Sequence, residues 1–338
     1  MSRADIVGRD PAELYSPEDY LVLQELRRKT RQMGRSRDEF YLPTKGGGRL
    51  PIVASVRSIE DPDGRLFAIA AFVDISEQKA AEQDLRTANT QLEKRQKEIE
   101  EDLALAARVQ QSLAPKPMVW GGMRVDTFYH PVRTIGGDFG LVSPLDEDHL
   151  NVLVGDVSGH GISSALIANR IYSETISQLN NGAPLGDMLR QLNHFVMQNI
   201  GSSLFFFTVS VARVDRSGRR MVFAGAGHPP AMIVQPGEEP RLLESRSTVL
   251  GVLSDAVDAE ATLEVQLDAG DRVVLYTDGI TDVFNSQGEM LGVAGVQRFV
   301  RETAMLPFHE MKKAILDRVA EWREGPPADD ISLVLVEV

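Results

Sequence analysis

The sequence predicts an α+β protein whose larger part is a sandwich of two antiparallel sheets flanked by helices. Residues 118–338 carry this prediction, because short apolar runs alternate there with glycine-rich turns around two main helical regions. Residues 77–113 contain many charges but neither glycine nor proline, which predicts one long helix. At 338 residues the chain also exceeds the usual size of one domain. We therefore predict a small unit at 1–76, a helical linker at 77–117 and a large domain at 118–338.

The composition excludes several functional classes. A formal net charge of −13 argues against nonspecific binding to nucleic acid, which needs a positive surface, and is compatible with bound divalent cations. The chain has no cysteine, which excludes disulfides and thiolate metal sites. No apolar run approaches the length of a membrane-spanning helix, and the amino terminus lacks the pattern of a signal peptide. We expect a cytoplasmic protein without nucleic-acid or membrane partners.

Residues 1–76 are predicted to form a small α+β unit. Pro17 opens a helical stretch in which the apolar residues Tyr20, Leu23 and Leu26 are spaced by three. Three runs rich in β-branched and aromatic residues follow, separated by glycine-containing turns. These predicted strands span residues 40–44, 51–57 and 66–74.

The predicted helix at 77–113 has a seven-residue apolar repeat. Such heptads predict a coiled coil, which needs at least one further helix. We expect a parallel homodimer through residues 77–113, ended by Pro115; the alternative is a single solvated helix packed on its own domain. One rung of the repeat comprises Leu85, Leu92, Ile99, Ala106 and Leu113, and a weaker one comprises Ala81, Ala88 and Val109, interrupted by Arg95 and Asp102.

The large domain is predicted to be rich in strands. Its strand candidates are residues 124–129, 139–142, 150–156, 205–215, 220–225, 231–235, 263–267, 272–277 and 331–338. Its helix candidates are residues 161–180, 184–200, 293–303 and 308–323.

Acidic residues recur at the ends of these predicted strands. Asp138, Asp156 and Asp278 each adjoin a glycine, and Asp329 and Asp330 directly precede the last strand. Carboxylates brought together repel each other unless cations neutralise them. The set therefore predicts a centre of two Mn²⁺ or Mg²⁺ ions with oxygen ligands, and no histidine cluster favours zinc. The alternative is that these aspartates are independent turn or cap residues.

A series of motifs occurs in a fixed order between residues 105 and 338. The motifs are Ala107–Pro115, Gly136–Phe139, Gly155–Gly161, Ala224–Pro230, Leu250–Val252, Tyr276–Asp282 and Asp329–Leu333. Each motif is weak alone, but the ordered set is specific. On these motifs the region resembles the metal-dependent protein phosphatases (PPM, or type 2C), and in particular their bacterial stage-II-sporulation-E and stress-regulator type.

This resemblance implies a β-sandwich with the metals at one end, and it implies roles for individual residues. Asp156 would bridge two Mn²⁺ or Mg²⁺ ions, and the backbone carbonyl of Val157 would bind one of them. Asp278 and Asp329 would complete the other site. Asp138 would act through metal-bound water. The implied reaction is hydrolysis of phosphoserine or phosphothreonine by a metal-activated water, without a covalent intermediate.

The resemblance also implies a substrate, a phosphorylated anti-sigma-factor antagonist of STAS-type fold, and control of activity through the helical linker. Three residues are candidates for lesser roles at the site. Asp330 would order the ligands, Arg133 would contact phosphate or lie solvated on a loop, and His160 would stabilise its turn rather than act as a general acid.

The sequence departs from the family pattern at one motif. The family usually has Gly-Gly-Asp-Phe-Tyr-Asp, whereas Gly140 and Leu141 occupy the last two positions here. The missing carboxylate leaves a second hypothesis open, a catalytically weak or inactive regulator of the same fold that binds a partner. Residues 136–139 also resemble a nucleotide-cyclase signature, but the glutamate that should follow is absent.

A second resemblance covers residues 41–79. The segment Val73–Lys79 is similar to the end of a PAS sensor domain, where the last strand leads into a signalling helix. A PAS domain has two further strands and short helices before this region. A partial PAS-like sensor domain is therefore predicted at 1–76. The alternatives are a truncated chain, a wrongly assigned start, a domain completed by a partner chain and a degenerate dimerisation element.

Overall fold

The structure, a computed structural model, divides into two units, Met1–Ile99 and Glu100–Val338. It describes residues 7–13, 15–44, 48–159, 161–200, 205–216, 219–258 and 260–338. His160, the predicted hairpin tip at 45–47 and the turn at 217–218 lie outside the described residues. The unit boundary falls within helix α2 (Ser76–Leu113), so the division into three domains stays a prediction.

The N-terminal unit contains one helix and one antiparallel sheet with the strand order β1-β2-β3. β1 begins five residues before its predicted start, because the polar segment that precedes the apolar run also pairs with β2. The elements are the short 3₁₀ helix η2 (Pro11–Glu13), α1 (Pro17–Met33), β1 (Arg35–Pro43), β2 (Arg49–Glu60) and β3 (Leu66–Asp74).

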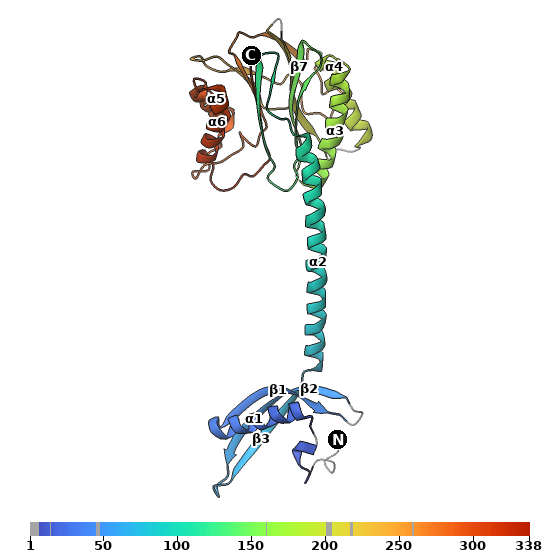
Figure 1. Cartoon of the computed structure of the whole chain (residues 1–338), viewed down its shortest axis with the longest axis vertical. Helices are drawn as coiled ribbons and strands as arrows, with labels where there is room; N and C mark the ends of the chain where they lie inside the picture. Colours follow the sequence, from blue (N-terminus) through green and yellow to red (C-terminus); the bar gives the residue numbers. More distant parts are fainter. Residues whose placement is uncertain are drawn as a thin grey trace. The chain divides into compact units, whose positions relative to one another are not determined.

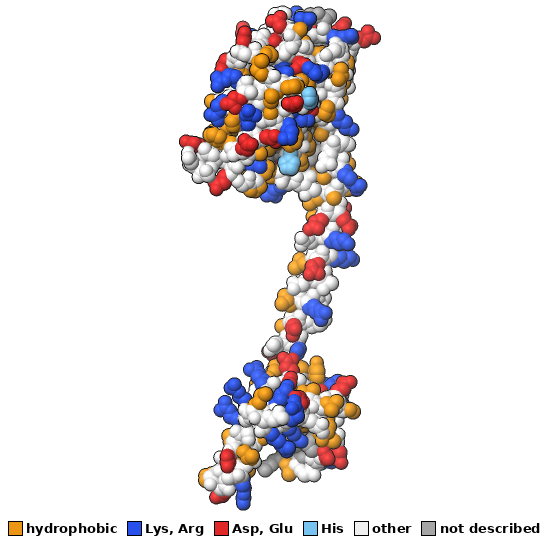
Figure 2. All heavy atoms as spheres, turned by 60° about the vertical axis from the view of Figure 1, so that its left-hand side comes forward, with side chains coloured by type: hydrophobic (Ala, Val, Ile, Leu, Met, Phe, Trp, Pro, Cys, Tyr) orange, Lys and Arg blue, Asp and Glu red, His pale blue; other side chains and the backbone are white. Residues whose placement is uncertain are grey.

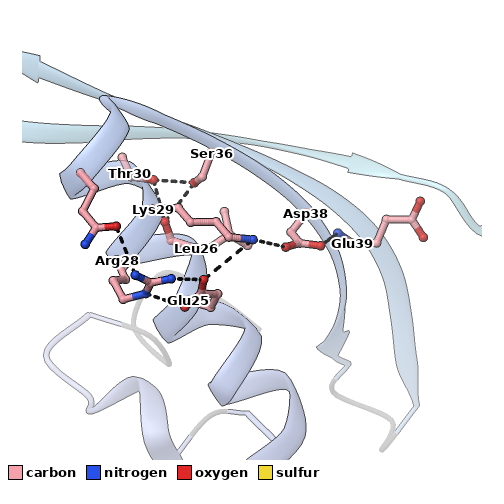
Figure 3. A network of polar contacts seen from close by, with 9 residues as sticks. Glu25, Leu26, Arg28, Lys29, Thr30, Ser36, Asp38 and Glu39 are labelled. Atoms are coloured by element: carbon pink, nitrogen blue, oxygen red, sulfur yellow. Dashed lines mark hydrogen bonds and ion pairs between the residues drawn. The ribbon is translucent and has the colours of Figure 1, made fainter.

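Helix α1 packs on β1 and β2 through a small core of Leu26, Phe40, Ile52 and Ala54. Polar contacts tie the end of the helix to β1 (Figure 3). Ser36 donates a hydrogen bond to the carbonyl of Leu26 (3.0 Å), and the Lys29 ammonium lies 3.6 Å from the Asp38 carboxylate. These contacts fix the helix against one face of the sheet.

Strand β3 is apolar and exposed along its whole length. Leu66 is 75% exposed, Ile69 58% and Val73 58%, and Phe67 and Phe72 are about as exposed. Successive side chains of a strand point to opposite faces, so both faces of β3 carry uncovered apolar groups. Apolar side chains of this unit and of α2 are visible on the surface in Figure 2.

Helix α2 starts directly after β3, where the Asp74 carboxylate accepts a hydrogen bond from the backbone N–H of Ser76. Its exposed apolar residues include the heptad residues Leu85 (63% exposed), Leu92 (62%) and Ile99 (57%). The helix ends two residues before Pro115, as expected for a residue that lacks a backbone donor.

The C-terminal unit contains two antiparallel sheets, which confirms the predicted fold class. One sheet has the order β11-β10-β13-β14-β5-β4 and the other β12-β9-β8-β7-β6. The strands are β4 (Met118–Trp120), β5 (Met123–His130), β6 (Asp138–Pro144), β7 (His149–Val157), β8 (Phe207–Asp215), β9 (Arg220–Ala226), β10 (Ala231–Val234), β11 (Arg241–Leu243), β12 (Thr262–Gln266), β13 (Arg272–Tyr276) and β14 (Ile331–Glu337).

Two helix pairs cover the outer faces of the sheets (Figure 1). Helices α3 (Ile162–Asn180) and α4 (Leu185–Asn199) pack on the five-stranded sheet, and α5 (Gly292–Thr303) and α6 (Phe308–Trp322) pack on the six-stranded sheet. A third apolar core lies between the two sheets. The short strands β4 and β11 were not predicted, because three residues are too few to show an alternating pattern.

Strand β7 shows why this layered arrangement suits the sequence. Val152 and Val154 point into the core between the sheets, and Leu153 points into the core under α3 and α4. Both faces are buried, so the strand is an almost continuous apolar run. The run ends at Asp156, which places a carboxylate at the end of a rigid central strand.

Among the described residues, the structure contains no helix that is both long enough and apolar enough to cross a membrane.

Replacing Leu153 by Ala is expected to lower the free energy of unfolding of the C-terminal unit by about 2–5 kcal/mol, because the side chain is fully buried. Leu166→Ala is the matched control, since Leu166 is 64% exposed, and should change stability by about 0.5 kcal/mol or less. Denaturant unfolding followed by tryptophan fluorescence measures both, because Trp120 and Trp322, the two tryptophans of the chain, lie in this unit. Equal effects of the two substitutions would contradict this layer assignment.

Candidate metal centre

The predicted acidic residues meet at one end of the sandwich. Asp138 begins β6 and lies opposite Asp156 of β7 in the antiparallel register. Asp278 follows β13, and Asp329 and Asp330 precede the neighbouring strand β14. Strand pairing therefore brings together residues that are far apart in the sequence.

The charges at this end of the sandwich repel one another. Burial raises the pKa of Asp156 to about 7, and the nearby carboxylates of Asp278 and Asp329 contribute to the rise. Burial also raises the pKa of Asp278 to about 6, helped by Asp329 and Asp282. Each of these carboxylates is therefore held where its negative charge is unfavourable in the absence of a cation.

Asp138 is the most deeply buried member, at 2% exposure. Its Oδ2 accepts hydrogen bonds from the hydroxyls of Thr277 (2.8 Å) and Ser332 (2.7 Å). Burial and the charge of Asp156 nevertheless raise the pKa of Asp138 well above its ordinary value. The two hydroxyls fix the orientation of the carboxylate toward Asp156.

Asp330 lies near Asp138 and Asp156, and both of its carboxylate oxygens bind backbone groups. Its two oxygens accept hydrogen bonds from the N–H groups of Val132 and Gly137, each at 2.7 Å. A Cβ atom at Gly136 would lie 2.0 Å from Asp330 Oδ2, so only glycine fits there. Asp330 thus holds the loop that leads into Asp138.

Two oxygens face the narrow space beside Gly137. A Cβ atom at this glycine would lie 2.6 Å from the carbonyl oxygen of Val157 and 3.2 Å from Asp156 Oδ1. The Val157 N–H also donates to the Gly137 carbonyl (3.3 Å). The carbonyl and the carboxylate named by the family resemblance therefore lie next to each other.

These donors fit hard divalent cations, which prefer carboxylate, carbonyl and water oxygens. Within the described part of the chain, no three Asp, Glu, His or Cys side chains alone form a ligand set for a metal ion. A cation at this place would therefore also need the Val157 carbonyl and water molecules as ligands. The repulsion between Asp156, Asp278 and Asp329 is the feature that a cation would relieve.

The remaining predicted residues have different surroundings. Arg133 is exposed on the loop that Asp330 holds. Asp329 is exposed and accepts a hydrogen bond from the N–H of Asp330 (2.8 Å). Leu141 is buried in the apolar core beside α3 and α4, away from the polar end of β6. His160 lies outside the described residues.

Sequence reasoning gave no role to Thr277 and Ser332, although each stands next to or near a predicted aspartate. It also assigned no contact to His228, which lies in the motif Ala224–Pro230. The His228 ring is buried, and burial lowers its pKa to about 4, so the ring is neutral. Its Nε2–H donates to the Tyr276 carbonyl (3.0 Å), and Nδ1 accepts from the Thr208 hydroxyl (2.8 Å). The ring thus supports the end of β13, two residues before Asp278.

Comparison with known proteins agrees with this fold. The sequence profile of the stage II sporulation protein E family (SpoIIE) matches residues 146–338, which is more than half of the chain. The chain belongs to this family.

Two curated relatives come from Bacillus subtilis (strain 168). Phosphoserine phosphatase RsbP is 26% identical over 241 residues, which cover 70% of this chain and 58% of RsbP. Phosphoserine phosphatase RsbU is 27% identical over 243 residues, which cover 71% of each chain. The chain thus spans less than two thirds of the length of RsbP.

Solved structures share the fold. The SiaA PP2C domain of Pseudomonas aeruginosa has a TM-score of 0.62 and 22% identity, over 72% of this chain and 98% of that chain. The PP2C domain of SpoIIE from Bacillus subtilis, with a fragment of its regulatory domain, has a TM-score of 0.54 and 14% identity, over 95% of this chain and 88% of that chain. The sandwich with its helix pairs is therefore a PP2C-type fold.

The raised pKa values predict how Mn²⁺ stabilises the protein. The folded pKa values of Asp156 (about 7) and Asp278 (about 6) lie above the ordinary 3.8, so the folded chain binds extra protons between these values. These groups therefore make metal-free protein less stable as pH rises through about 4 to 7. Mn²⁺ at about 100 times its Kd adds about 2.7 kcal/mol, a rise in Tm of roughly 5–10 °C. We expect this rise at pH 8 and a smaller one at pH 5.5, measured by thermal unfolding after EDTA treatment.

The control for this experiment is Asp156→Asn. It should abolish most of the Mn²⁺ effect at pH 8 because it removes the central carboxylate. A rise in Tm of the same size at both pH values would contradict competition between protons and cations.

Proposed function

We propose that the protein is a metal-dependent protein serine/threonine phosphatase. The observation that carries this proposal is the meeting of Asp138, Asp156, Asp278 and Asp329 at one end of a PP2C-type sandwich, where burial, together with the charges of Asp278 and Asp329, raises the pKa of Asp156 to about 7. Proteins rarely keep unneutralised carboxylates together unless a cation or a reaction uses them.

Two Mn²⁺ or Mg²⁺ ions are the proposed cofactors. Asp156 would be shared between them, and the Val157 carbonyl would belong to one site. Asp278 and Asp329 would complete the other, and Asp138 would contribute through water. When bound, such ions activate water for in-line attack on phosphorus and neutralise charge on the phosphoryl oxygens.

The chain itself supplies orientation. Thr277 and Ser332 fix the Asp138 carboxylate, and Asp330 fixes the backbone that precedes it. Arg133 is exposed on the same loop, where its guanidinium is free to approach a phosphoryl group. Arg133 would help to align the phosphoserine side chain, and the other three residues would keep Asp138 in place.

The proposed substrate is a phosphorylated anti-sigma-factor antagonist of STAS-type fold, in the cytoplasm. This proposal follows from the family resemblance, and the names of RsbP and RsbU as phosphoserine phosphatases are compatible with it. The segment formed by the N-terminal unit and α2 would regulate the reaction.

The alternative, a weak or inactive regulator, rested on the leucine at position 141. Its side chain fills the core between the sheet and the helices α3 and α4. The substitution is thus compatible with packing, and no further observation favours loss of activity.

Asp278→Asn should abolish metal-dependent phosphate release, because it removes a proposed carboxylate ligand. The loss should exceed the roughly 10- to 100-fold typical of residues that only support a ligand. Release of phosphate from a phosphoserine protein and from a chromogenic phosphate ester, with added Mn²⁺, measures it. Asp317→Asn is the matched control, since Asp317 pairs with Lys313 on the surface of α6.

Absence of turnover in the wild-type chain with Mn²⁺ or Mg²⁺, on both substrates, would refute the phosphatase. Turnover that survives Asp278→Asn would refute the assigned metal site.

A homodimer through residues 77–113 is the proposed regulatory form. Leu85, Leu92 and Ile99 lie one heptad apart and are all more than half exposed, as expected for a helix that needs a partner. The exposed apolar strand β3 leads directly into this helix. A partner copy on α2 would bring a second β3 nearby. The PAS-like nature of the N-terminal unit remains part of this proposal.

Leu92→Cys should form a disulfide-linked dimer under mild oxidation, because an interface position of a parallel coiled coil lies next to its own copy. The chain has no cysteine, so the new thiol has no competitor. Thr90→Cys, two residues earlier on the outer side of the repeat, is the control. Cross-linking measured on non-reducing gels should be strong for position 92 and weak for position 90. Equal cross-linking, or a wild-type monomer in light scattering at high concentration, would contradict the dimer.

A further inference from the structure

The last turn of α2 makes a double hydrogen bond with the loop that carries Asp138. The side-chain amide of Gln110 donates to the Gly136 carbonyl (2.7 Å), and its Oε1 accepts from the Gly136 N–H (3.1 Å). Both partners lie within the C-terminal unit. One side chain therefore satisfies both backbone groups of one residue.

Gln110 differs from the rest of its helix. The structure describes every residue of α2, and among them only Gln110 is buried, at 7% exposure. A buried carboxamide costs free energy unless its donor and acceptor are both used, and here both are used. Its neighbour Gln111 is exposed. The position is thus specific to a side chain that can both donate and accept.

The loop that Gln110 binds is fixed on its other side as well. The Gly137 N–H donates to Asp330, and the Gly137 carbonyl accepts from the Val157 N–H. All four backbone polar groups of Gly136 and Gly137 are therefore occupied. Gln110 provides two of these four contacts, and the proposed metal-binding segments provide the others.

The end of α2 and the residues that follow it also lie close to Asp138. The Pro115 carbonyl accepts a hydrogen bond from the Thr127 hydroxyl of β5 (2.8 Å). A pocket next to the helix end is lined by residues that include Leu113, Tyr129 and Asp138. Gly140 stands where the family usually has tyrosine. A Cβ atom at Gly140 would lie only 3.1 Å from the Pro115 ring, so the glycine leaves space for the segment around Pro115.

We propose that Gln110 is a positioning residue through which the last turn of α2 sets the conformation of residues 136–138, and with it the affinity for the metal ions. This inference rests on the proposed function for its metal part. A rotation or shift of the helix end would break both hydrogen bonds together, because they share one side chain. Gly136 and Gly137 would then lose two of their four backbone hydrogen bonds, and the backbone that leads into Asp138 would be held less firmly.

The test compares three variants of the full chain. Gln110→Met keeps the approximate volume and removes both hydrogen bonds. Gln110→Glu keeps the acceptor but turns a carboxylate oxygen toward the Gly136 carbonyl. Gln111→Met makes the same change one residue further on, at an exposed position, and serves as the control.

Three measurements are needed. Hydrogen exchange of EDTA-treated protein reports the loop at residues 131–138 without any metal. Calorimetric titration with Mn²⁺, together with phosphate release as a function of Mn²⁺ concentration, reports the metal site. We expect faster exchange in this loop for both Gln110 variants, and a Mn²⁺ requirement raised by about 10- to 100-fold. Turnover at saturating Mn²⁺ should return to near the wild-type value. Gln111→Met should behave as wild type.

Three outcomes would overturn the proposal. The first is unchanged loop exchange and Mn²⁺ requirement in both Gln110 variants. The second is faster exchange throughout the C-terminal unit in both variants, which would give Gln110 only a role in stability. The third is turnover that saturating Mn²⁺ does not restore. If the wild type binds no Mn²⁺, the proposed function fails and the metal part of this inference fails with it, whereas the exchange data still decide whether Gln110 holds the loop.

Discussion

The repulsion between carboxylates at the end of the sandwich is the constraint on which the site depends. Asp138 and Asp156 face each other across one strand pair, and Asp278 and Asp329 flank another. Such groups would move apart in a flexible chain. They stay together because buried strands on both sides fix the backbone. Rigid packing of the sheets thus holds an arrangement that local energetics alone would disfavour.

The register of the strands decides which side chains take part. A slip by one residue between β6 and β7 would turn Asp138 toward the helices and bring Phe139 into the site. The alternation in β7, with Leu153 in one core and Val152 and Val154 in the other, excludes that slip. The apolar pattern that forms the core therefore also sets the direction of the carboxylates. The same alternation stabilises the fold and arranges the site.

The sequence was sufficient to predict the architecture and the acidic residues, because strand alternation and strand-end aspartates are local patterns. It could not predict partners set by tertiary contact. Asp138 meets the hydroxyls of Thr277 and Ser332, which are 139 and 194 residues away. Gln110 occurred in a recognised motif, but its bond with Gly136 depends on how the helix end docks. Strand β3 is exposed at the edge of its sheet although its apolar composition is that of a buried strand, and the sequence pattern alone does not distinguish the two.

The exposed strand β3 has a consequence for how the protein is made. An edge strand with apolar side chains and unpaired backbone groups is a template for any extended chain. If the proposed homodimer forms, its partner copy would have to cover β3 before another unfolded segment pairs with this strand. The local concentration of sister chains during translation would then influence how much of the protein reaches its native assembly, independently of the stability of the sandwich that follows.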